Sequence, residues 1–223
     1  MTGRKFVKGI LNCFLRPVIS FYLKKPRTYN YKGIHLKIYP GVFHPGFFFS
    51  TRTLIRYIKS LEINNKAILE LGAGSGLISV YCAKKGAFVT SSDISKVAVQ
   101  NLYENAKDND VTLNIIESDL FLNIPPQIFD LIIVNPPYFP RDPVREQDMA
   151  WNCGENFEYF EKLFGNIAGY TNTDTEVIMI LSEDCDLSKI NSVAERNNFS
   201  METVLKKRIL WEWNYIFRIA KHA

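Results

Sequence analysis

Residues 67–76 read Ala-Ile-Leu-Glu-Leu-Gly-Ala-Gly-Ser-Gly, a short apolar run followed by three glycines in alternate positions. Such a run is typical of a buried strand, and the spacing of the apolar residues that follow predicts a helix over 75–85. Glycines at a strand-to-helix turn let a ligand approach the backbone where a Cβ would collide. The stretch therefore predicts an α/β fold with a ligand site at the end of this strand.

Strands and helices alternate from residue 67 to the end of the sequence. The sequence predicts strands at 67–71, 88–92, 112–117, 130–134, 176–181, 201–210 and 215–220, with helices at 75–85, 96–108, 158–170 and 187–197. The last two strands face each other across 211–214, which predicts an antiparallel hairpin at one edge. Alternation of this kind indicates a mainly parallel, seven-stranded sheet with helices on both faces.

The first part of the chain differs in composition from the rest. Residues 1–66 hold thirteen Lys/Arg and one acid, Glu62, a balance of +12, whereas residues 67–223 hold fourteen Lys/Arg and twenty-two acids, a balance of −8. Such asymmetry indicates an anionic partner for the front of the molecule: RNA, DNA or a membrane surface. A solvated basic face is the alternative interpretation.

Two short elements are expected ahead of the sheet. Apolar residues at helical spacing predict an amphipathic helix over 4–15, and residues 28–38 predict a hairpin that turns at Lys32-Gly33. A further helix is expected from Ser50 or Thr51. We expect a basic N-terminal extension over 1–45 and one domain over 46–223.

Composition excludes several classes of protein. With 47% hydrophobic and 22% charged residues, the chain can bury a substantial core, which excludes a disordered or fibrous protein. Four scattered cysteines and three histidines provide no zinc-binding pattern. No apolar run approaches the ~18–20 residues that a membrane span needs. We therefore expect a cytoplasmic protein with reduced thiols and no metal.

Two carboxylates follow the next predicted strands. Asp93 lies 21 residues after Gly72 and could accept hydrogen bonds from both hydroxyls of a ribose. An NAD-dependent oxidoreductase would have the same spacing, so this residue does not discriminate between NAD and another ligand that contains a ribose. Asp119 could accept a hydrogen bond from an adenine amino group, or could cap a loop or helix.

Residues 135–138, Asn-Pro-Pro-Tyr, end the buried strand predicted at 130–134. Two prolines cannot continue a central strand, and they hold the backbone stiff. The Asn135 side-chain carbonyl and the Pro136 backbone carbonyl could each accept one hydrogen of an –NH2 group, while Tyr138 stacks on the planar group that carries it. Two such acceptors stabilise the charge that develops when the nitrogen attacks a methyl group, and the reaction needs no histidine base.

The glycine loop and the Asn-Pro-Pro-Tyr segment together resemble the class I S-adenosylmethionine-dependent methyltransferases, over about residues 40–223. Release-factor glutamine methyltransferases are also similar in the segment 151–160, and RNA adenine-N6 methyltransferases share the first two features. The resemblance implies a Rossmann-like fold, S-adenosylmethionine as cofactor, and a segment at 40–51 close to it. Asn135, Pro136, Pro137 and Tyr138 would be the catalytic residues. The implied cofactor-binding residues are Glu70, Gly72, Gly74, Gly76, Asp93, Ile94, Asp119, Leu120 and Asn135.

We therefore expect methylation of a planar nitrogen in the translation machinery, on a glutamine of a release factor or ribosomal protein. Adenine N6 of tRNA or rRNA is the alternative acceptor, and a non-catalytic nucleoside- or RNA-binding module is a further alternative. Bacterial glutamine methyltransferases usually carry a separate N-terminal helical domain, for which about 45 residues are too few. This departure leaves docking to a release factor open.

Overall fold

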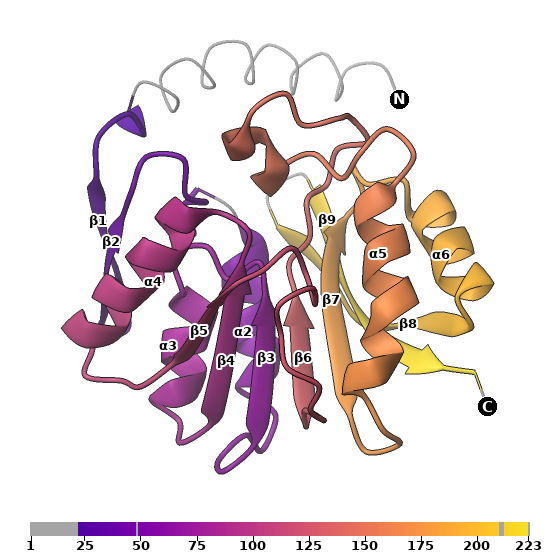
Figure 1. The fold of residues 1–223 in the computed structure, drawn as a ribbon, viewed down its shortest axis with the longest axis horizontal. Helices are drawn as coiled ribbons and strands as arrows, with labels where there is room; N and C mark the ends of the chain where they lie inside the picture. Colours follow the sequence, from indigo (N-terminus) through magenta and orange to yellow (C-terminus); the bar gives the residue numbers. More distant parts are fainter. Residues whose placement is uncertain (1–21, 48, 210–211, 223) are drawn as a thin grey trace.

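A seven-stranded sheet forms the centre of the computed structural model, which describes residues 22–47, 49–209 and 212–222 (Figure 1). Its order is β5-β4-β3-β6-β7-β9-β8. The strands are β3 (Ala67–Leu71), β4 (Phe88–Asp93), β5 (Asn114–Glu117), β6 (Leu131–Val134), β7 (Glu176–Ser182), β8 (Phe199–Ile209) and β9 (Glu212–Lys221). Strands β3 to β7 are parallel, and β9 pairs antiparallel with both β7 and β8. The predicted sheet and its edge hairpin are confirmed.

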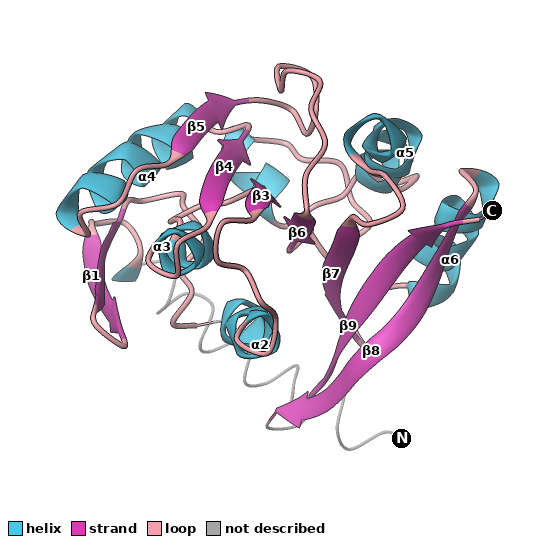
Figure 2. Cartoon of the chain, turned by 90° about the horizontal axis from the view of Figure 1, so that it is seen from below, coloured by secondary structure: helices cyan, strands magenta, loops and turns pink. Residues whose placement is uncertain are grey.

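Helices cover both faces of this sheet, as the alternation predicts. Helices α5 and α6 lie on one side of the sheet and α2 and α3 lie on the other (Figure 2). The helices are α2 (Phe49–Ile58), α3 (Leu77–Ala83), α4 (Lys96–Asp108), α5 (Glu158–Asn166) and α6 (Leu187–Arg196), with short 3-10 helices η1 (Glu146–Ala150) and η2 (Ile167–Tyr170). All four residues of β6 are buried, because a central parallel strand is covered on both faces.

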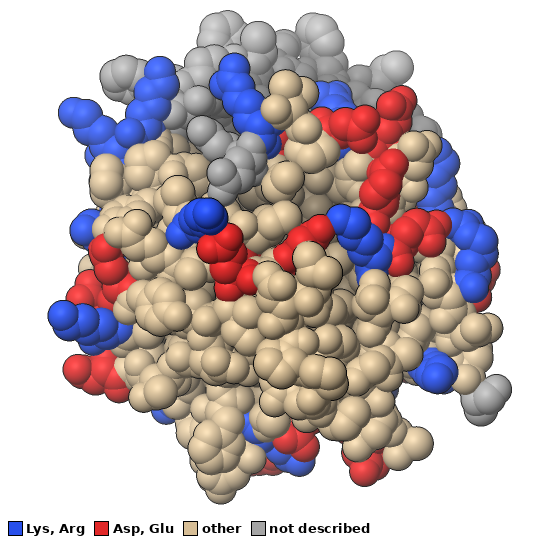
Figure 3. All heavy atoms as spheres, in the orientation of Figure 1, with Lys and Arg blue, Asp and Glu red and all other residues tan. Residues whose placement is uncertain are grey.

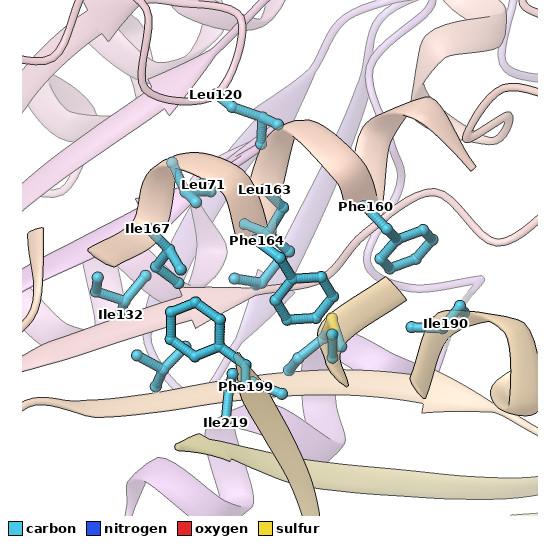
Figure 4. Packing of buried hydrophobic residues seen from close by; sticks show 14 of the residues in the cluster. Leu71, Leu120, Ile132, Phe160, Leu163, Phe164, Ile167, Ile190, Phe199 and Ile219 are labelled. Atoms are coloured by element: carbon cyan, nitrogen blue, oxygen red, sulfur yellow. The ribbon is translucent and has the colours of Figure 1, made fainter. Parts of the chain in front are cut away.

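Two apolar clusters fill the spaces between the sheet and its helices. On the α5–α6 side, Phe164 points toward Phe199, with 6.0 Å between ring centroids (Figure 4). On the other side, the buried residues of α2, α3 and β2 pack on Ile68 of β3. Because side chains alternate along a strand, Leu69 and Leu71 face the first cluster while Ile68 and Glu70 face the second.

The predicted hairpin before the sheet is also confirmed. It consists of β1 (Arg27–Tyr31) and β2 (Ile34–Ile38), joined by Lys32 and Gly33, which both have positive φ (48° and 81°). Alternate residues Ile34, Leu36 and Ile38 are buried in the second cluster. The helix expected at 4–15 lies outside the described residues, and the division of the chain at residue 45 stays a prediction.

The prediction that residues 211–214 form the turn of the edge hairpin is wrong. Residues 212–214 belong to β9, which begins with Glu212 paired to Ile209 of β8. The β8–β9 ladder extends this far because two hydrogen bonds join Trp213 of β9 to Glu183. The Glu183 amide donates to the Trp213 carbonyl at 2.9 Å, and the Trp213 amide donates to Glu183 Oε1 at 3.1 Å.

Helix α3 is two residues shorter at each end than the helix predicted over 75–85. It begins at Leu77, because Gly76 has a φ of 80° and belongs to the preceding loop. Within the part of the chain that the structure describes, no helix is long and apolar enough to cross a membrane.

Candidate active site

The glycine loop between β3 and α3 is held by backbone hydrogen bonds. Gly72, Gly74 and Gly76 all have positive φ (67°, 55° and 80°), a backbone conformation that residues other than glycine rarely adopt. The Ala73 amide donates to the Ser92 carbonyl at 2.9 Å, at the end of β4. A Cβ added at Gly72 would meet no heavy atom within 4 Å, so open space lies against this backbone. The loop therefore fits a ligand that approaches it closely.

Asp93, the last residue of β4, binds this loop directly. Its Oδ2 accepts from the Gly74 amide at 2.8 Å, and its Oδ1 accepts from the Ser95 amide at 3.0 Å. A carboxylate has two lone pairs on each oxygen, so a carboxylate at this position can bind backbone amides and ribose hydroxyls together. Ile94, also predicted to contact the cofactor, is 38% exposed beside it.

Glu70 lies beneath the loop, with its carboxyl group in the interior. It is only 5% exposed, and the Ser79 hydroxyl donates to its Oε2 while the Ser91 hydroxyl donates to Ser79 at 2.6 Å. Burial raises the pKa of Glu70 to about 8, against the lowering effect of the hydrogen bond with Ser79. The carboxyl group is therefore mostly protonated at pH 7, and its hydrogen bond with Ser79 connects the end of β3 to α3.

Asp119 and Leu120 follow β5 at the same edge of the sheet. Lys162 of α5 donates to Asp119 Oδ2 at 2.5 Å. The Leu120 side chain is buried in the core cluster and its φ is 51°, so only its backbone is placed to meet a ligand. Tyr159, on the first turn of α5, has a raised pKa, through burial and then through the nearby charges of Asp93 and Asp119. Helix α5 thus brings a phenol close to both carboxylates.

Asn135 and Gly72 occupy equivalent positions on neighbouring parallel strands. Leu71 pairs with Val134, so each strand continues by one residue into the segment of interest. Pro136 and Pro137 are buried, whereas Asn135 and Tyr138 are half-buried. The Tyr138 hydroxyl donates to Asn135 Oδ1 at 3.4 Å. The glycine loop and the Asn-Pro-Pro-Tyr segment therefore lie side by side at the carboxyl edge of the sheet, where ligands bind in folds of this type.

Tyr138 remains a neutral phenol at physiological pH. Burial is the largest cause of its raised pKa, followed by the neighbouring Cys185, and Glu212 raises it further. A hydrogen bond with the Ser50 side chain has the opposite, lowering effect. The ring can therefore stack on a planar group and donate a hydrogen bond, but it does not act as a base.

Segments from before and after these strands complete the site. Val42 and Phe43 lie against the glycine loop, since a Cβ at Gly74 would be 3.9 Å from Val42 Cγ1 and 3.7 Å from Phe43 Cβ. The Phe43 and Trp151 rings are 5.3 Å apart. Trp151 is held beside the prolines, because its carbonyl accepts from the Phe139 amide at 2.8 Å. The predicted position of segment 40–51 is consistent with these contacts.

Several residues of the site were not identified individually from the sequence. Tyr159, Ser50 and Trp151 lie in segments whose proximity was expected, but only the fold shows which of their side chains reach the site. Cys153, also nearby, has its pKa raised to about 11 by burial, so it is a neutral thiol at pH 7 rather than a nucleophile. Among the described side chains, no group of three or more His, Cys, Asp or Glu could hold a metal ion.

Comparison with known proteins follows this geometry. The family model described as "Methyltransferase small domain" matches residues 33–156, which include the hairpin strand β2, the glycine loop and Asn135–Tyr138. The chain belongs to this methyltransferase family. The predicted resemblance to class I methyltransferases is confirmed, and the alternative of an NAD-dependent oxidoreductase is not supported.

Two curated relatives of this family member carry names from glutamine methylation. A Methanocaldococcus jannaschii protein, named as a candidate protein N5-glutamine methyltransferase, is 45% identical over 111 residues, covering 49% of this chain and 53% of its own length. A release factor glutamine methyltransferase from Fusobacterium nucleatum is 26% identical over 204 residues, covering 82% of this chain and 57% of its own length. The chain thus spans little more than half the length of these two relatives.

A solved structure confirms the fold of the family. The 16S rRNA N2 G1207 methyltransferase of T. thermophilus, determined with AdoMet and guanosine, has a TM-score of 0.64 and 18% sequence identity. The match covers 89% of this chain and 50% of that one. At this level of identity, the likeness establishes the Rossmann-like methyltransferase fold and no finer property.

Proposed function

We propose that the chain transfers a methyl group from S-adenosylmethionine to the side-chain amide nitrogen of a glutamine, in a protein of the translation machinery. The observation that carries the proposal is the position of Asn135–Tyr138, one residue beyond β6 and beside the glycine loop that follows β3. A methyl donor on the loop and an amide on the Asn-Pro-Pro-Tyr segment would then be neighbours.

The residues of the chain divide the work between the two ligands. Glu70, Gly72, Gly74 and Gly76 would surround the methionine end of the cofactor. Asp93 would bind the ribose, and Ile94, Asp119 and Leu120 would surround the adenine. When bound, S-adenosylmethionine supplies an electrophilic methyl group on a sulfonium.

On the acceptor side, Asn135 and the Pro136 carbonyl would each accept one hydrogen of the amide –NH2 group. These bonds direct the nitrogen lone pair toward the methyl carbon and stabilise the positive charge that develops on nitrogen. Forming the N–C bond would break the bond between the methyl carbon and sulfur, whose electron pair would stay on sulfur, and the nitrogen would release a proton to solvent. Tyr138 would hold the amide plane by stacking, and positioning supplies the remaining acceleration.

The names of the relatives favour glutamine as the methyl acceptor, while the excess of Lys and Arg in residues 1–66 favours a nucleic acid. Thirteen of the 27 Lys/Arg lie in residues 1–66, and adenine N6 of RNA presents the same –NH2 group to the same acceptors. On the face seen in Figure 3, however, lysine and arginine side chains lie among acidic ones across the middle of the molecule, and those without acidic neighbours lie at the upper left. Glutamine is therefore the first candidate, and adenine N6 of tRNA or rRNA is the second.

Labelled cofactor separates these candidates directly. The purified chain is incubated with methyl-labelled S-adenosylmethionine and a cell extract, and the product is divided between RNase and protease digestion. We expect protease alone to release the label, and N5-methylglutamine to appear after enzymatic hydrolysis. Release by RNase, with N6-methyladenine, would establish the second candidate. If S-adenosylhomocysteine binds but no label is transferred, the chain is a non-catalytic module; Asn135→Ala is the control.

A further inference from the structure

Three asparagines spaced four residues apart, two in α4 and one directly after its last residue, bind the outer edge of β2. They are Asn101, Asn105 and Asn109, all buried at 0–3% exposure. Four helical residues rise about 6 Å and two strand residues about 6.6 Å, so successive asparagines meet successive outward-facing backbone groups of the strand. Each asparagine accepts from a strand amide and donates to a strand carbonyl, as a neighbouring strand would.

Each of the two outer asparagines binds one backbone amide and one backbone carbonyl within residues 35–39. Asn101 accepts from the Tyr39 amide at 3.3 Å and donates to the Lys37 carbonyl at 2.6 Å. Asn109 accepts from the His35 amide at 3.0 Å and donates to the His35 carbonyl at 2.6 Å. These two asparagines therefore fix the register of the hairpin strand on the helix.

Asn105, between them, also reaches the glycine loop. Its Oδ1 accepts from the Lys37 amide at 2.8 Å, and its Nδ2 donates both to the Lys37 carbonyl and to the Ser75 carbonyl, each at 2.9 Å. Because the Lys37 amide needs an acceptor, the side-chain oxygen of Asn105 must face it. The two N–H groups of Asn105 then bind the Lys37 and Ser75 carbonyls. Among the described residues, neither Asn101 nor Asn109 makes a comparable bond to the loop.

The strand and the loop are connected a second time through the chain itself. After β2 ends at Ile38, the chain leads within five residues to Val42 and Phe43, which lie against Gly74. The other fixed points of the loop are the Ser92 carbonyl and the Asp93 carboxylate, both at the end of β4. Asn105 is thus the point at which the N-terminal hairpin and the proposed cofactor loop share one buried side chain.

We infer that Asn105 is a positioning residue that couples docking of the β1–β2 hairpin to the conformation of the glycine loop. Because such coupling is reciprocal, a cofactor on the loop stabilises the hairpin, and a ligand on the hairpin changes affinity for the cofactor. The inference about cofactor affinity rests on the proposed function, whereas the coupling of hairpin and loop does not.

Amide hydrogen exchange in the protein without ligand tests the coupling itself. In Asn109→Ala, we expect exchange to accelerate about tenfold or more at His35, with the loop amides Ala73 and Gly76 unchanged. In Asn105→Ala, we expect similar acceleration at Lys37 and, in addition, at Ala73 and Gly76. Equal exchange of the loop amides in the two variants would overturn the inference. Thermal unfolding of both variants shows whether each remains folded at the temperature of measurement.

Affinity for S-adenosylhomocysteine, measured by calorimetry, tests the consequence. Losing one buried hydrogen bond to the loop should raise the dissociation constant about tenfold in Asn105→Ala, and less than about twofold in Asn101→Ala and Asn109→Ala. A uniform rise in all three variants would mean that the asparagines act only through stability, and would contradict the inference. If the unsubstituted chain does not bind while the exchange result holds, the proposed function has failed and the coupling stands.

Asn105→Asp provides a second variant in case the alanine does not fold. Its side chain keeps an acceptor for the Lys37 amide but, when ionised, has no donor for the Ser75 carbonyl. We expect Lys37 to keep more protection than in the alanine variant, while the loop amides exchange as rapidly as they do there. Full protection of the loop in this variant would overturn the role assigned to the bond with Ser75.

Discussion

The glycine loop and the Asn-Pro-Pro-Tyr segment extend from neighbouring strands, yet their conformations are maintained by different means. The loop has three glycines with positive φ and is fixed by hydrogen bonds from its backbone to β4, Asp93 and Asn105. The segment 135–138 is stiffened by two buried prolines, which have no backbone N–H and so need no hydrogen-bond acceptor. The loop of the proposed cofactor site therefore presents backbone to its ligand, whereas the turn of the proposed acceptor site presents the Asn135 and Tyr138 side chains beside the Pro136 carbonyl.

This difference predicts how the two sites respond to substitution. Changing a side chain of the turn should affect chemistry while the turn keeps its shape. Changing a residue of the loop, or one that binds it, should affect cofactor affinity and stability together. The predictions below test this contrast, beginning with the largest expected effect.

The largest effect is expected at Asn135. Asn135→Ala should leave binding of S-adenosylmethionine nearly intact while kcat falls by roughly 10²–10³, the loss of one acceptor in the transition state. Asn135→Asp keeps an acceptor of the same shape and should retain more activity than the alanine variant. Steady-state kinetics and calorimetry on both variants give the measurement. If cofactor affinity falls in parallel with kcat, Asn135 belongs to the cofactor site and the proposed division is wrong.

Asp93 should behave in the opposite way. Asp93→Ala removes the proposed ribose acceptor together with the bonds to the Gly74 and Ser95 amides, so affinity for S-adenosylhomocysteine should fall by about 2–4 kcal/mol. Asp93→Asn keeps one acceptor oxygen and should lose less. An unchanged dissociation constant for the alanine variant would remove Asp93 from the cofactor site.

Glu70 should make the stability of the fold depend on pH. Its pKa is about 8 in the folded chain and 4.5 for an exposed glutamate, so folding takes up a proton at pH values between these two. Stability from this group is therefore present at low pH and is lost as pH rises toward 8, by about 2 kcal/mol between pH 6 and 8. Glu70→Gln should abolish this slope in urea unfolding measurements. An identical slope in both proteins would contradict the buried, neutral carboxyl group.

The sequence predicted the elements that have strong local patterns. The strand at 67–71 and the helix at 96–108 match β3 and α4 residue for residue, because apolar runs and helical spacing are local signals. The turn at 211–214 was wrong because the bonds that extend β9 come from Glu183, about 30 residues earlier.

Site residues follow the same rule. The glycines and Asn135–Tyr138 carry their conformational reasons within a few residues, so the sequence predicts them. The asparagine spacing of α4 is visible in the sequence, but its meaning depends on a strand more than 60 residues away. The inward direction of Glu70 and the approach of Tyr159 to two carboxylates likewise depend on contacts across the fold.

The smallest expected effect separates two reasons for a glycine in the loop. Gly72 and Gly76 both have positive φ, so alanine at either position should cost about 1 kcal/mol of unfolding free energy. At Gly76 the added Cβ would also lie 2.6 Å from Cδ2 of the buried Leu102, so a further loss of about 1 kcal/mol is expected there.

At Gly72 the added methyl group meets only open space, where the proposed cofactor would lie. Of the two variants, Gly72→Ala should therefore be the more stable and Gly76→Ala the less stable. Gly72→Ala should also bind S-adenosylhomocysteine more weakly than the unsubstituted chain does. Urea unfolding and calorimetry on the same two proteins measure both quantities. If Gly72→Ala binds S-adenosylhomocysteine as tightly as the unsubstituted chain does, the cofactor does not approach this backbone. The proposed contrast between the loop and the Asn-Pro-Pro-Tyr segment would then be wrong at Gly72.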